Sequence, residues 1–197
     1  MFMERICREE SAEVFGDFPI IKTKRFILRN ILDSDCYDLF YIFCNKEVMK
    51  YSGMSSVNSI EQVKRIIRKL NSFYLKKTTL MWAIEDKSSG KVIGDCGFIN
   101  LNLSSKRGEI GYLLKKDYWK KGVMTEVISA ILDYSFKQLE LNRVQASIDE
   151  RNIGSIKLLK GCGFKKEGVL REYIYDKEKD KYSNLILLSK LKSDTLI

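Results

Sequence analysis

The spacing of apolar residues alternates between two periods along this 197-residue chain, and this alternation limits the local structures that can form. Residues 58–77 carry apolar side chains at three-and-four spacing, which is typical of an amphipathic helix, and Ser59 with Gln62 forms a capping box at its start. Three strand-like segments follow it, over residues 79–86, 91–102 and 107–116. The turn sequence KSSG joins the first two, so we expect a helix followed by a three-strand meander.

Further strands and helices are predicted on both sides of this meander. Before it, we expect a strand over residues 20–30 and a helix over residues 33–45. After it, we expect a helix directly behind Gly122, a strand over residues 142–149, a short helix over residues 152–164 and two strands over residues 166–191. Because neighbouring strands come first and helical crossovers come later, this order predicts an α+β fold with a mixed sheet.

No internal boundary interrupts the chain, which contains a single proline, Pro19, and neither a glycine/serine linker nor a low-complexity tract. We therefore expect an N-terminal arm over residues 1–18 and one domain over residues 19–197. The longest apolar runs are too short to cross a bilayer, and the N-terminus contains acidic residues rather than an apolar signal segment. The expected location is cytoplasmic, with no membrane partner.

The sequence contains no histidine, which removes Ser–His and Cys–His nucleophilic pairs and HExxH metal sites. The five cysteines are scattered and never spaced C-x-x-C, so we expect neither a disulfide framework nor a metal site. Proton transfer must then use a carboxylate, hydroxyl, thiol, lysine or water. The net charge of +9 suggests a polyanionic partner such as nucleic acid, the ribosome, an acidic peptide or a phosphorylated cofactor, or else only a lysine-rich soluble surface.

The segment DYWKKGVMTEVISAILDYSF (117–136) places Gly122 between Lys121 and Val123, directly before an apolar helical stripe. A helix that begins there presents unpaired backbone N–H groups and a partial positive charge beside two lysines. Glycine also lets the backbone approach a bulky anion closely. The residues alone leave two interpretations, an anion-binding site or a solvated turn.

Four stretches, in their order and spacing, resemble the GNAT N-acetyltransferase superfamily, and most closely its RimJ/RimL type, which acetylates protein N-termini. They are RFILRNILDSD (25–35), GEIGYLLKKDYWKKGVMTEV (108–127), NRVQASIDERNIGS (142–155) and KGCGFKKEGVLRE (160–172). The resemblance extends from about Ile20 to Leu191. It implies the GNAT (acyl-CoA N-acyltransferase) fold, an α+β architecture with a mixed central sheet of about seven strands flanked by helices.

The resemblance also implies that acetyl-CoA is the cofactor and coenzyme A the product. The superfamily signature R/Q-x-x-G-x-G/A corresponds to the run from Trp119 to Met124, in which Lys120 and Met124 replace the usual small residues. The backbone N–H groups of Leu113 and Leu114 are expected to bind the pantetheine arm and to polarise the thioester carbonyl. The remaining cofactor contacts are expected from Trp119, Lys120, Lys121, Gly122, Val123, Met124, Thr125, Asn152 and Ser155.

A hydroxyl is expected to protonate the departing thiolate. Many superfamily members carry a tyrosine for this purpose seven residues after the asparagine that corresponds to Asn152, but this chain has Leu159 there. Ser155 stands three residues after Asn152, as in the RimJ/RimL type, where a serine is assigned that role. The alternative is structural: Asn152 would then be only a helix N-cap and Ser155 a first-turn residue.

A carboxylate is expected to take the proton of the amine, directly or through water, because no imidazole is available. Glu109 is the first choice, since it lies on the strand before the loop, and its alternative is a surface glutamate without a role. The weaker candidates are Glu172 and Asp149. Large side chains that are expected to line the acceptor side are Tyr51, Met54 and Trp82.

We therefore expect an acyltransferase that moves an acetyl group from acetyl-CoA to a primary amine by direct attack in a ternary complex. The expected acceptor is a protein N-terminal α-amine, such as that of a ribosomal protein or peptide. One alternative acceptor is a small amine, either a polyamine or an aminoglycoside. The other alternative is a non-catalytic module that binds the ribosome or RNA, although no RNA-binding motif supports direct nucleic-acid contact. A monomer or a homodimer is expected.

Overall fold

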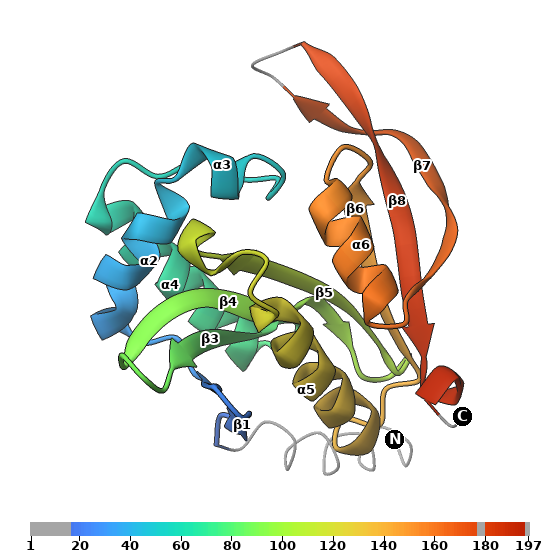
Figure 1. Ribbon diagram of the computed structural model, residues 1–197, viewed down its shortest axis with the longest axis horizontal. Helices are drawn as coiled ribbons and strands as arrows, with labels where there is room; N and C mark the ends of the chain where they lie inside the picture. The colour runs from blue at the N-terminus through green and yellow to red at the C-terminus, as the bar shows by residue number, and fades with distance from the viewer. Residues whose placement is uncertain (1–16, 177–179, 196–197) are drawn as a thin grey trace, which may run out of the picture.

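The computed structural model describes residues 17–176 and 180–195 and is built around an eight-stranded sheet (Figure 1). The order across the sheet is β1-β2-β3-β4-β5-β6-β8-β7, and all neighbours are antiparallel except the pair β5 and β6. The expectation of a mixed sheet is therefore confirmed. The strands are β1 (Ile21–Lys22), β2 (Phe26–Arg29), β3 (Leu80–Asp86), β4 (Lys91–Asn102), β5 (Arg107–Leu114), β6 (Arg143–Asp149), β7 (Lys165–Asp176) and β8 (Lys181–Leu191).

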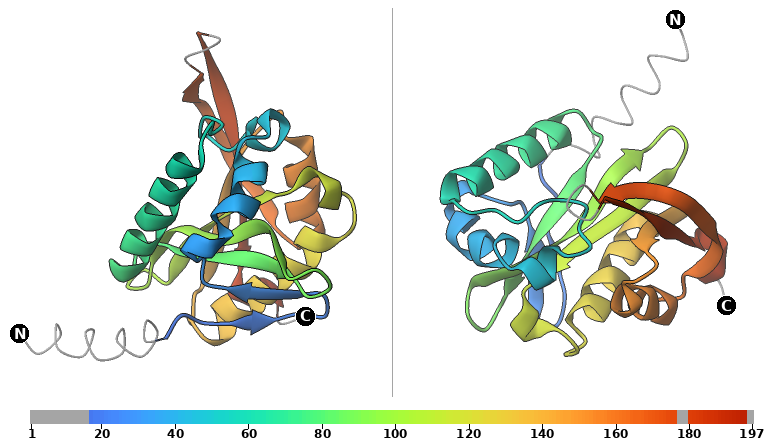
Figure 2. Two further views of the ribbon diagram at one scale, coloured as in Figure 1. Left: turned by 90° about the vertical axis from the view of Figure 1, so that its left-hand side faces the viewer. Right: turned by 90° about the horizontal axis from the view of Figure 1, so that it is seen from above.

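Helices cover both faces of the sheet (Figure 2). Asn152 and Ser59 begin two of them as N-caps, because their side-chain oxygens accept hydrogen bonds from backbone N–H groups of the first turn. The α-helices are α2 (Cys36–Phe43), α3 (Lys46–Met49), α4 (Ile60–Leu75), α5 (Val123–Lys137) and α6 (Ile153–Gly161). The 3₁₀ helices are η1 (Asp33–Asp35), η2 (Lys116–Tyr118) and η3 (Lys192–Thr195).

The sheet contains one more strand than expected because residues 20–30 form the antiparallel pair β1 and β2 instead of one strand. A tight turn separates the two: the Thr23 hydroxyl oxygen accepts from the Phe26 N–H at 3.0 Å, and the Thr23 N–H donates to the Phe26 carbonyl at 2.9 Å. The short helix α3 was not predicted either. Asn45 begins it as an N-cap, because its side-chain oxygen accepts hydrogen bonds from two backbone N–H groups. The helix has only four residues, too few to show a repeat of apolar positions.

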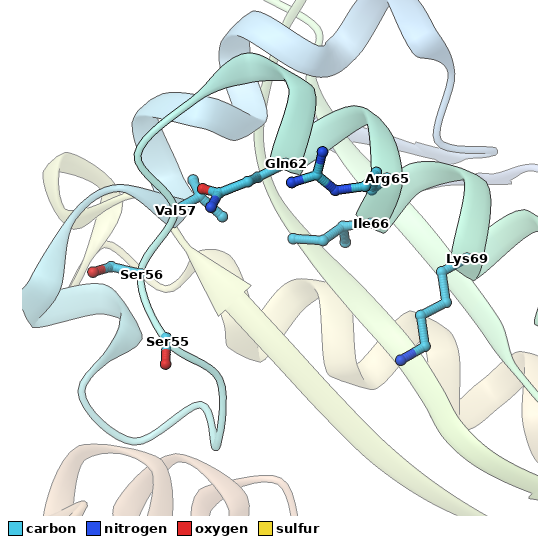
Figure 3. A pocket seen from close by; sticks show the side chains of 7 residues that line it. All are labelled: Ser55, Ser56, Val57, Gln62, Arg65, Ile66 and Lys69. Atoms are coloured by element: carbon cyan, nitrogen blue, oxygen red, sulfur yellow. The ribbon is translucent and has the colours of Figure 1, made fainter. Parts of the chain in front are cut away.

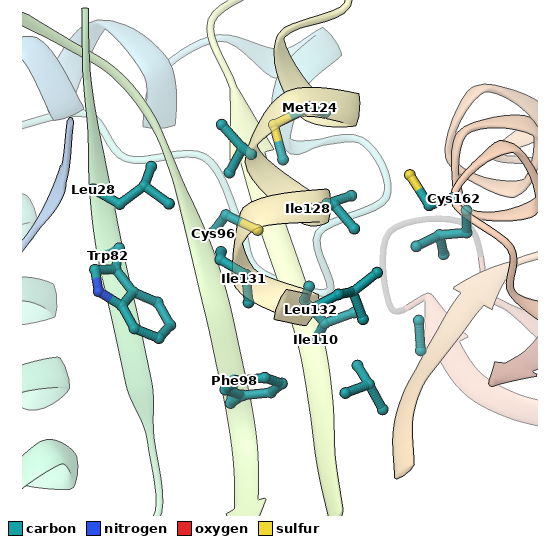
Figure 4. Packing of buried hydrophobic residues seen from close by; sticks show 14 of the residues in the cluster. Leu28, Trp82, Cys96, Phe98, Ile110, Met124, Ile128, Ile131, Leu132 and Cys162 are labelled. Atoms are coloured by element: carbon teal, nitrogen blue, oxygen red, sulfur yellow. The ribbon is translucent and has the colours of Figure 1, made fainter. Parts of the chain in front are cut away.

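Two buried clusters lie on opposite faces of the sheet. The first contains Trp82, Phe98 and Ile110 together with the apolar stripe of α5, including Ile128 (Figure 4). The second contains Met81 and Ala83, which alternate with Trp82 along β3, together with apolar residues of α2 and α4. Both clusters are continuous and closely packed, so they hold the central strands in place between two layers of helix.

The N-terminal arm expected over residues 1–18 lies outside the described residues, apart from Asp17 and Phe18. The Phe18 ring packs against the rings of Tyr74 and Trp82, with centroids 4.9 and 6.0 Å away. Among the described helices, none is long and apolar enough to cross a membrane.

The parallel pair β5 and β6 forms a fork. The strands pair only where Arg107–Glu109 lies opposite Arg143–Gln145, and beyond these residues they diverge (Figure 1). β4 stays paired with β5 as far as Leu114, and β8 stays paired with β6 as far as Asp149. The divergence therefore leaves the two inner strand edges without a strand partner.

Candidate active site

The inner edge of β5 presents backbone groups to the fork. The Lys115 N–H donates to the Ile93 carbonyl of β4 at 2.8 Å, and Leu114 lies opposite Gly94. Since N–H directions alternate along an antiparallel strand, the N–H groups of Tyr112 and Leu114 point away from β4 and into the fork. The Trp119 indole N–H donates to the Leu114 carbonyl at 2.8 Å, on that same open side.

Because of the same alternation, the N–H groups of Leu113 and Leu114, which were both expected to contact the cofactor, point in opposite directions. The Leu113 N–H is directed toward β4, where it stabilises the carboxylate of Asp95. The Leu114 N–H is directed into the fork. Of the two, only Leu114 can present its N–H to a molecule lying between β5 and β6, and this difference arises from the strand register rather than from residue type.

The loop before α5 has alternating signs of φ. The angle φ is −67° at Trp119, +58° at Lys120, negative at Lys121 and +69° at Gly122. Where φ alternates in sign along turn residues, successive N–H groups can converge on an anion, so this loop is a candidate anion site. The left-handed φ explains the glycine at 122, because a side chain there would be strained. Lys120 adopts the left-handed region without being glycine, which is a local strain of the kind that gathers at binding loops.

The side chains of this loop divide into two groups. Lys120, Lys121 and Thr125 are exposed, whereas Val123 and Met124, the first residues of α5, point into the core, where Figure 4 shows Met124. Met124 stands where the superfamily signature has a small residue, and its larger side chain packs into the core instead of entering the loop. The loop keeps its backbone N–H groups and two lysine side chains on the outside.

Arg25 supports this loop from the turn between β1 and β2. Its guanidinium donates to the Glu126 carboxylate at 2.7 Å and to the Lys121 carbonyl at 3.0 Å, and its backbone N–H donates to Glu126 at 2.8 Å. Burial acts to raise the pKa of Glu126, but the hydrogen bonds from Arg25 outweigh it and hold the pKa below its usual value. No local sequence signal connects residues this far apart.

A basic cavity lies beside the loop. It has a volume of about 480 Å³ and is lined by the cationic side chains of Lys24, Arg25, Lys87 and Lys121, with Asp86 and Tyr118 among its other residues. Hydrogen bonds from Ser88 and Tyr118 lower the pKa of Asp86. The excess of cations raises the electrostatic potential next to the α5 N-terminus and favours an anion there.

Glu109 lies at the point where the fork opens. It is the last β5 residue paired with β6, where it faces Gln145, and on its other side it lies opposite Asn100 of β4. Its side chain is half-buried. Within the described part of the chain, its carboxylate makes no hydrogen bond or ion pair, so it can accept a proton from a molecule in the fork.

The two weaker candidates for the base are placed less favourably. Asp149 is buried and accepts two hydrogen bonds from the Arg151 guanidinium, at 2.8 and 2.6 Å, so its oxygens are engaged in an ion pair. Glu172 is exposed and lies in an irregular stretch of β7 with φ +51°, where its N–H donates to Asn184. Neither residue lies at the opening of the fork.

The first turn of α6 lies at the end of β6. The Asn152 side-chain oxygen accepts from the Ser155 N–H at 3.2 Å, so the asparagine acts as an N-cap. Leu159, at the position where many superfamily members carry a tyrosine, is fully buried in the core. The Ser155 hydroxyl lies near the phenol of Tyr112, which projects from β5, but the two do not meet with hydrogen-bonding geometry. The structure thus brings Ser155 next to a second hydroxyl that the sequence did not single out.

Asp95 is a second residue missed from the sequence. It is 6% exposed, on β4 opposite Leu113, and burial raises its pKa to about 7. It lies on the face of the sheet that α2 and α4 cover, since the neighbouring Ala83 and Leu113 pack there. An acid in a strand otherwise rich in apolar residues is the signal that could have identified it.

The acceptor side differs from the expectation at one residue. Trp82 is fully buried on the α5 face, and its indole N–H donates to the Pro19 carbonyl at 2.8 Å, so the expectation that it lines the acceptor side was wrong. Large aromatic residues fill cores more often than they line open sites. Met54 is exposed, and the Tyr51 ring lies 5.9 Å from the Arg151 guanidinium, so the loop after α3 reaches the far end of β6.

A smaller cavity of about 300 Å³ lies between that loop and α4 (Figure 3). Its polar lining comes from Ser55, Ser56, Gln62, Arg65 and Lys69. None of the site residues expected from the sequence lines it. In the described ranges, no group of three or more histidine, cysteine, aspartate or glutamate side chains could hold a metal ion.

Comparison with known proteins gives consistent matches. Residues 25–165 match the acetyltransferase (GNAT) domain. The chain is 40% identical over 158 residues to the uncharacterized N-acetyltransferase YoaA of Bacillus subtilis (strain 168), covering 80% of this chain and 89% of that protein. The crystal structure of ribosomal-protein-S5-alanine acetyltransferase from Vibrio fischeri is 25% identical, with a TM-score of 0.74 over 89% of this chain and 98% of that one. Mycobacterium smegmatis RimJ in complex with CoA-disulfide has the same fold, with 18% identity, a TM-score of 0.81 and coverage of 91% and 90%.

Proposed function

The chain belongs to the acetyltransferase (GNAT) domain family and is an acetyl-CoA-dependent N-acetyltransferase, and we propose that its acceptor is the N-terminal α-amine of a protein. The observation that carries the proposed site is the fork itself. It leaves strand edges free next to the loop before α5, with Glu109, which has no partner among the described residues, at its opening. These features fit a cofactor that has a diphosphate at one end and a thioester at the other.

The residues at the fork suit each part of acetyl-CoA. The N–H groups of residues 120–125 and the positive end of α5 hold the diphosphate. The inner edge of β5 binds the amide groups of the pantetheine arm as a neighbouring strand would. When bound, acetyl-CoA supplies an acetyl thioester, whose carbonyl is open to attack by an amine.

The chain's own groups then assist the transfer. Glu109, directly or through a water molecule, takes the proton that the amine must lose. The Leu114 N–H donates a hydrogen bond to the thioester carbonyl, where negative charge develops during the attack. Ser155, in the first turn of α6, lies on the far side of the fork and donates to the departing sulfur.

Three observations support a protein α-amine as the acceptor. The matched structure from Vibrio fischeri is named as a ribosomal-protein-S5-alanine acetyltransferase. The net charge of +9 suits a target that is carried on a polyanionic particle and opposes free polyamines, which are cations. Tyr51 and Arg151 border the far end of the fork, where a peptide could lie against them.

The test is the release of free thiol from acetyl-CoA with two panels of acceptors. The first contains peptides that begin with alanine or serine, each with an N-terminally blocked copy, and the second contains spermidine and an aminoglycoside. Peptide-dependent release, with mass spectrometry that places the acetyl group on the α-nitrogen, is the expected result. Release with the small amines alone would overturn the proposed acceptor, and no release with any amine would leave only a binding role.

The cofactor site is tested separately by calorimetry. Gly122→Glu places a carboxylate against the diphosphate and should abolish acetyl-CoA binding. Gly90→Glu is the matched control, because Gly90 also has a left-handed φ, +66°, in a turn with no atom near an added Cβ. If Gly122→Glu bound acetyl-CoA as tightly as Gly90→Glu, the diphosphate would not lie at this loop.

A further inference from the structure

The hydroxyl of Tyr112 is buried without a hydrogen-bond partner. Across residues 17–176 and 180–195, no donor or acceptor reaches it with hydrogen-bonding geometry. Buried hydroxyl groups in folded proteins are nearly always hydrogen-bonded, because an unmade hydrogen bond costs free energy that an apolar side chain would not. A phenylalanine would fill the same space without this penalty. The hydroxyl therefore points to a partner that joins the site from outside the chain.

The position of Tyr112 indicates what that partner is. Tyr112 lies on β5 beyond Glu109, the last residue paired with β6, so it stands within the fork. Its side chain packs on the α5 face of the sheet, whereas Leu113 packs on the other face. The Ser155 hydroxyl, from the first turn of α6, lies near the same phenol on the opposite side of the fork, outside hydrogen-bonding geometry.

Within the described residues, the ionisable groups that shift the pKa of Tyr112 are the thiols of Cys96 and Cys162. Burial raises the pKa of both thiols, so they remain neutral at physiological pH. Two hydroxyl donors beside neutral thiols are suited to an anion that forms only briefly, such as a thiolate.

We propose that the Tyr112 and Ser155 hydroxyls together donate hydrogen bonds to the sulfur of coenzyme A as it leaves. This inference rests on the proposed function, since it requires acetyl-CoA in the fork. When the amine nitrogen has bonded to the acetyl carbon, the carbon–sulfur bond breaks and its electron pair remains on sulfur. The amine's proton goes to Glu109 or water, and the thiolate takes a proton later from solvent.

Tyr112 is a hydrogen-bond donor in this step and not the source of the proton. Burial raises the pKa of its phenol above the usual value, with the Ser155 hydroxyl only partly opposing the rise. An ordinary thiol has a pKa of about 8.5, so transfer of the phenolic proton to a thiolate would be unfavourable. A donor that keeps its proton stabilises the leaving sulfur in every turnover without itself needing to be reprotonated.

The inference is tested with Tyr112→Phe, which removes the hydroxyl and keeps the ring. The thiolate absorbs in the ultraviolet, so the pKa of the coenzyme A thiol can be titrated while it is bound to the protein. In the wild-type protein we expect this pKa to lie below that of free coenzyme A. In Tyr112→Phe we expect it to rise by about one unit, and kcat to fall about tenfold to a hundredfold, with little change in the KM for acetyl-CoA.

Two further variants separate this role from a structural one. Ser155→Ala should raise the bound thiol pKa in the same direction, and the double variant should raise it further. Tyr134→Phe is the matched control: Tyr134 is also half-buried but packs against Trp82 in the core, so its removal should leave the thiol pKa unchanged. Thermal unfolding should show that Tyr112→Phe is at least as stable as the wild type, because the lost hydroxyl had no partner.

The outcomes distinguish this inference from the proposed function. If wild type and Tyr112→Phe hold bound coenzyme A with the same thiol pKa, the inference is overturned, and continued acetyl transfer by the wild type would leave the proposed function intact. If Tyr112→Phe were strongly destabilised, the hydroxyl would have a structural partner and the inference would fail on that ground. If the wild type bound no coenzyme A, both proposals would fail together.

Discussion

Arg25 and Glu126 stand 101 residues apart in the chain and are joined by two hydrogen bonds, at 2.8 and 2.7 Å, from the arginine backbone N–H and guanidinium. Glu126 is in the first turn of α5, where its negative charge suits the positive end of the helix. Left unpaired, it would repel an anion bound at the same end. Arg25 neutralises it and also holds the Lys121 carbonyl, so the turn between β1 and β2 shapes the loop.

Removing this support should weaken cofactor binding. In Arg25→Met, the Glu126 carboxylate is left unpaired near the diphosphate, and we expect the dissociation constant for acetyl-CoA to rise about tenfold at low salt. Calorimetry at two salt concentrations measures it. The double variant Arg25→Met/Glu126→Gln removes the repulsion, so it should recover part of the lost affinity. Equal weakening in the single and double variants would contradict an electrostatic role.

Glu109 should govern the chemical step and not cofactor binding. We expect Glu109→Gln to lower kcat about a hundredfold at pH 7, because the amine loses the group that accepts its proton, with the KM for acetyl-CoA little changed. Activity should partly recover as the pH rises and more of the amine is already deprotonated. The control is Glu140→Gln, an exposed carboxylate that forms an ion pair with Lys106. A kcat equal to that of the control would exclude Glu109 as the base.

Asp95 should make stability depend on pH. Its pKa of about 7 in the folded protein exceeds the value of about 3.9 expected in the unfolded chain. Between these values the unfolded state releases the proton and the folded state keeps it. Stability therefore falls as the pH rises, by about 1.4 kcal/mol per unit, and falls no further once the pH passes 7.

The variant Asp95→Asn removes this titration and should be more stable than the wild type at pH 8, by about 3–4 kcal/mol, with a smaller difference at pH 5. Urea unfolding at the two pH values measures the change. If the free energies of unfolding of the wild type and Asp95→Asn changed with pH in the same way, the Asp95 carboxyl would have its ordinary pKa in the folded protein.

Arg29 should be important for stability. Its guanidinium donates to both oxygens of the buried Asp35, at 2.8 and 2.9 Å, and to Glu85 at 2.5 Å. Arg29→Met leaves Asp35 as an uncompensated buried charge, and we expect a loss of about 3 kcal/mol in the free energy of unfolding. The exposed ion pair Lys137–Asp133 is the control, and Lys137→Met should change stability by less than about 0.5 kcal/mol. Equal effects would contradict the structural role.

The local elements could be predicted because their signals are local. The strand over residues 91–102 matches β4, and the helix expected over residues 58–77 contains α4. Apolar residues recur every second residue in a half-buried strand and at three-and-four spacing in an amphipathic helix. Both patterns can be recognised within one short segment of the sequence. Gly122 could be identified as a loop residue for the same reason, since a left-handed φ before a helix restricts the residue at that one position.

Side chains that depend on distant parts of the chain could not be placed in this way. Trp82 was expected at the acceptor side but lies in the core, because its face of β3 is covered by α5, some forty residues later. The pairing of Arg25 with Glu126 and the approach of Ser155 to Tyr112 likewise join separate elements. Residue types at these positions are compatible with many surroundings, and only the packing selects one.

The sequence by itself determined most of the elements, their order and the family resemblance, because each depends on short contiguous stretches of residues. The tertiary structure alone decided that β5 and β6 part after Glu109 and Gln145, which turns the Leu114 N–H into the fork and leaves the Tyr112 hydroxyl without a partner. The physical reason is register. Which strand lies beside which, and for how many residues, follows from the packing of helices on both faces of the sheet and not from the periodicity of any one strand.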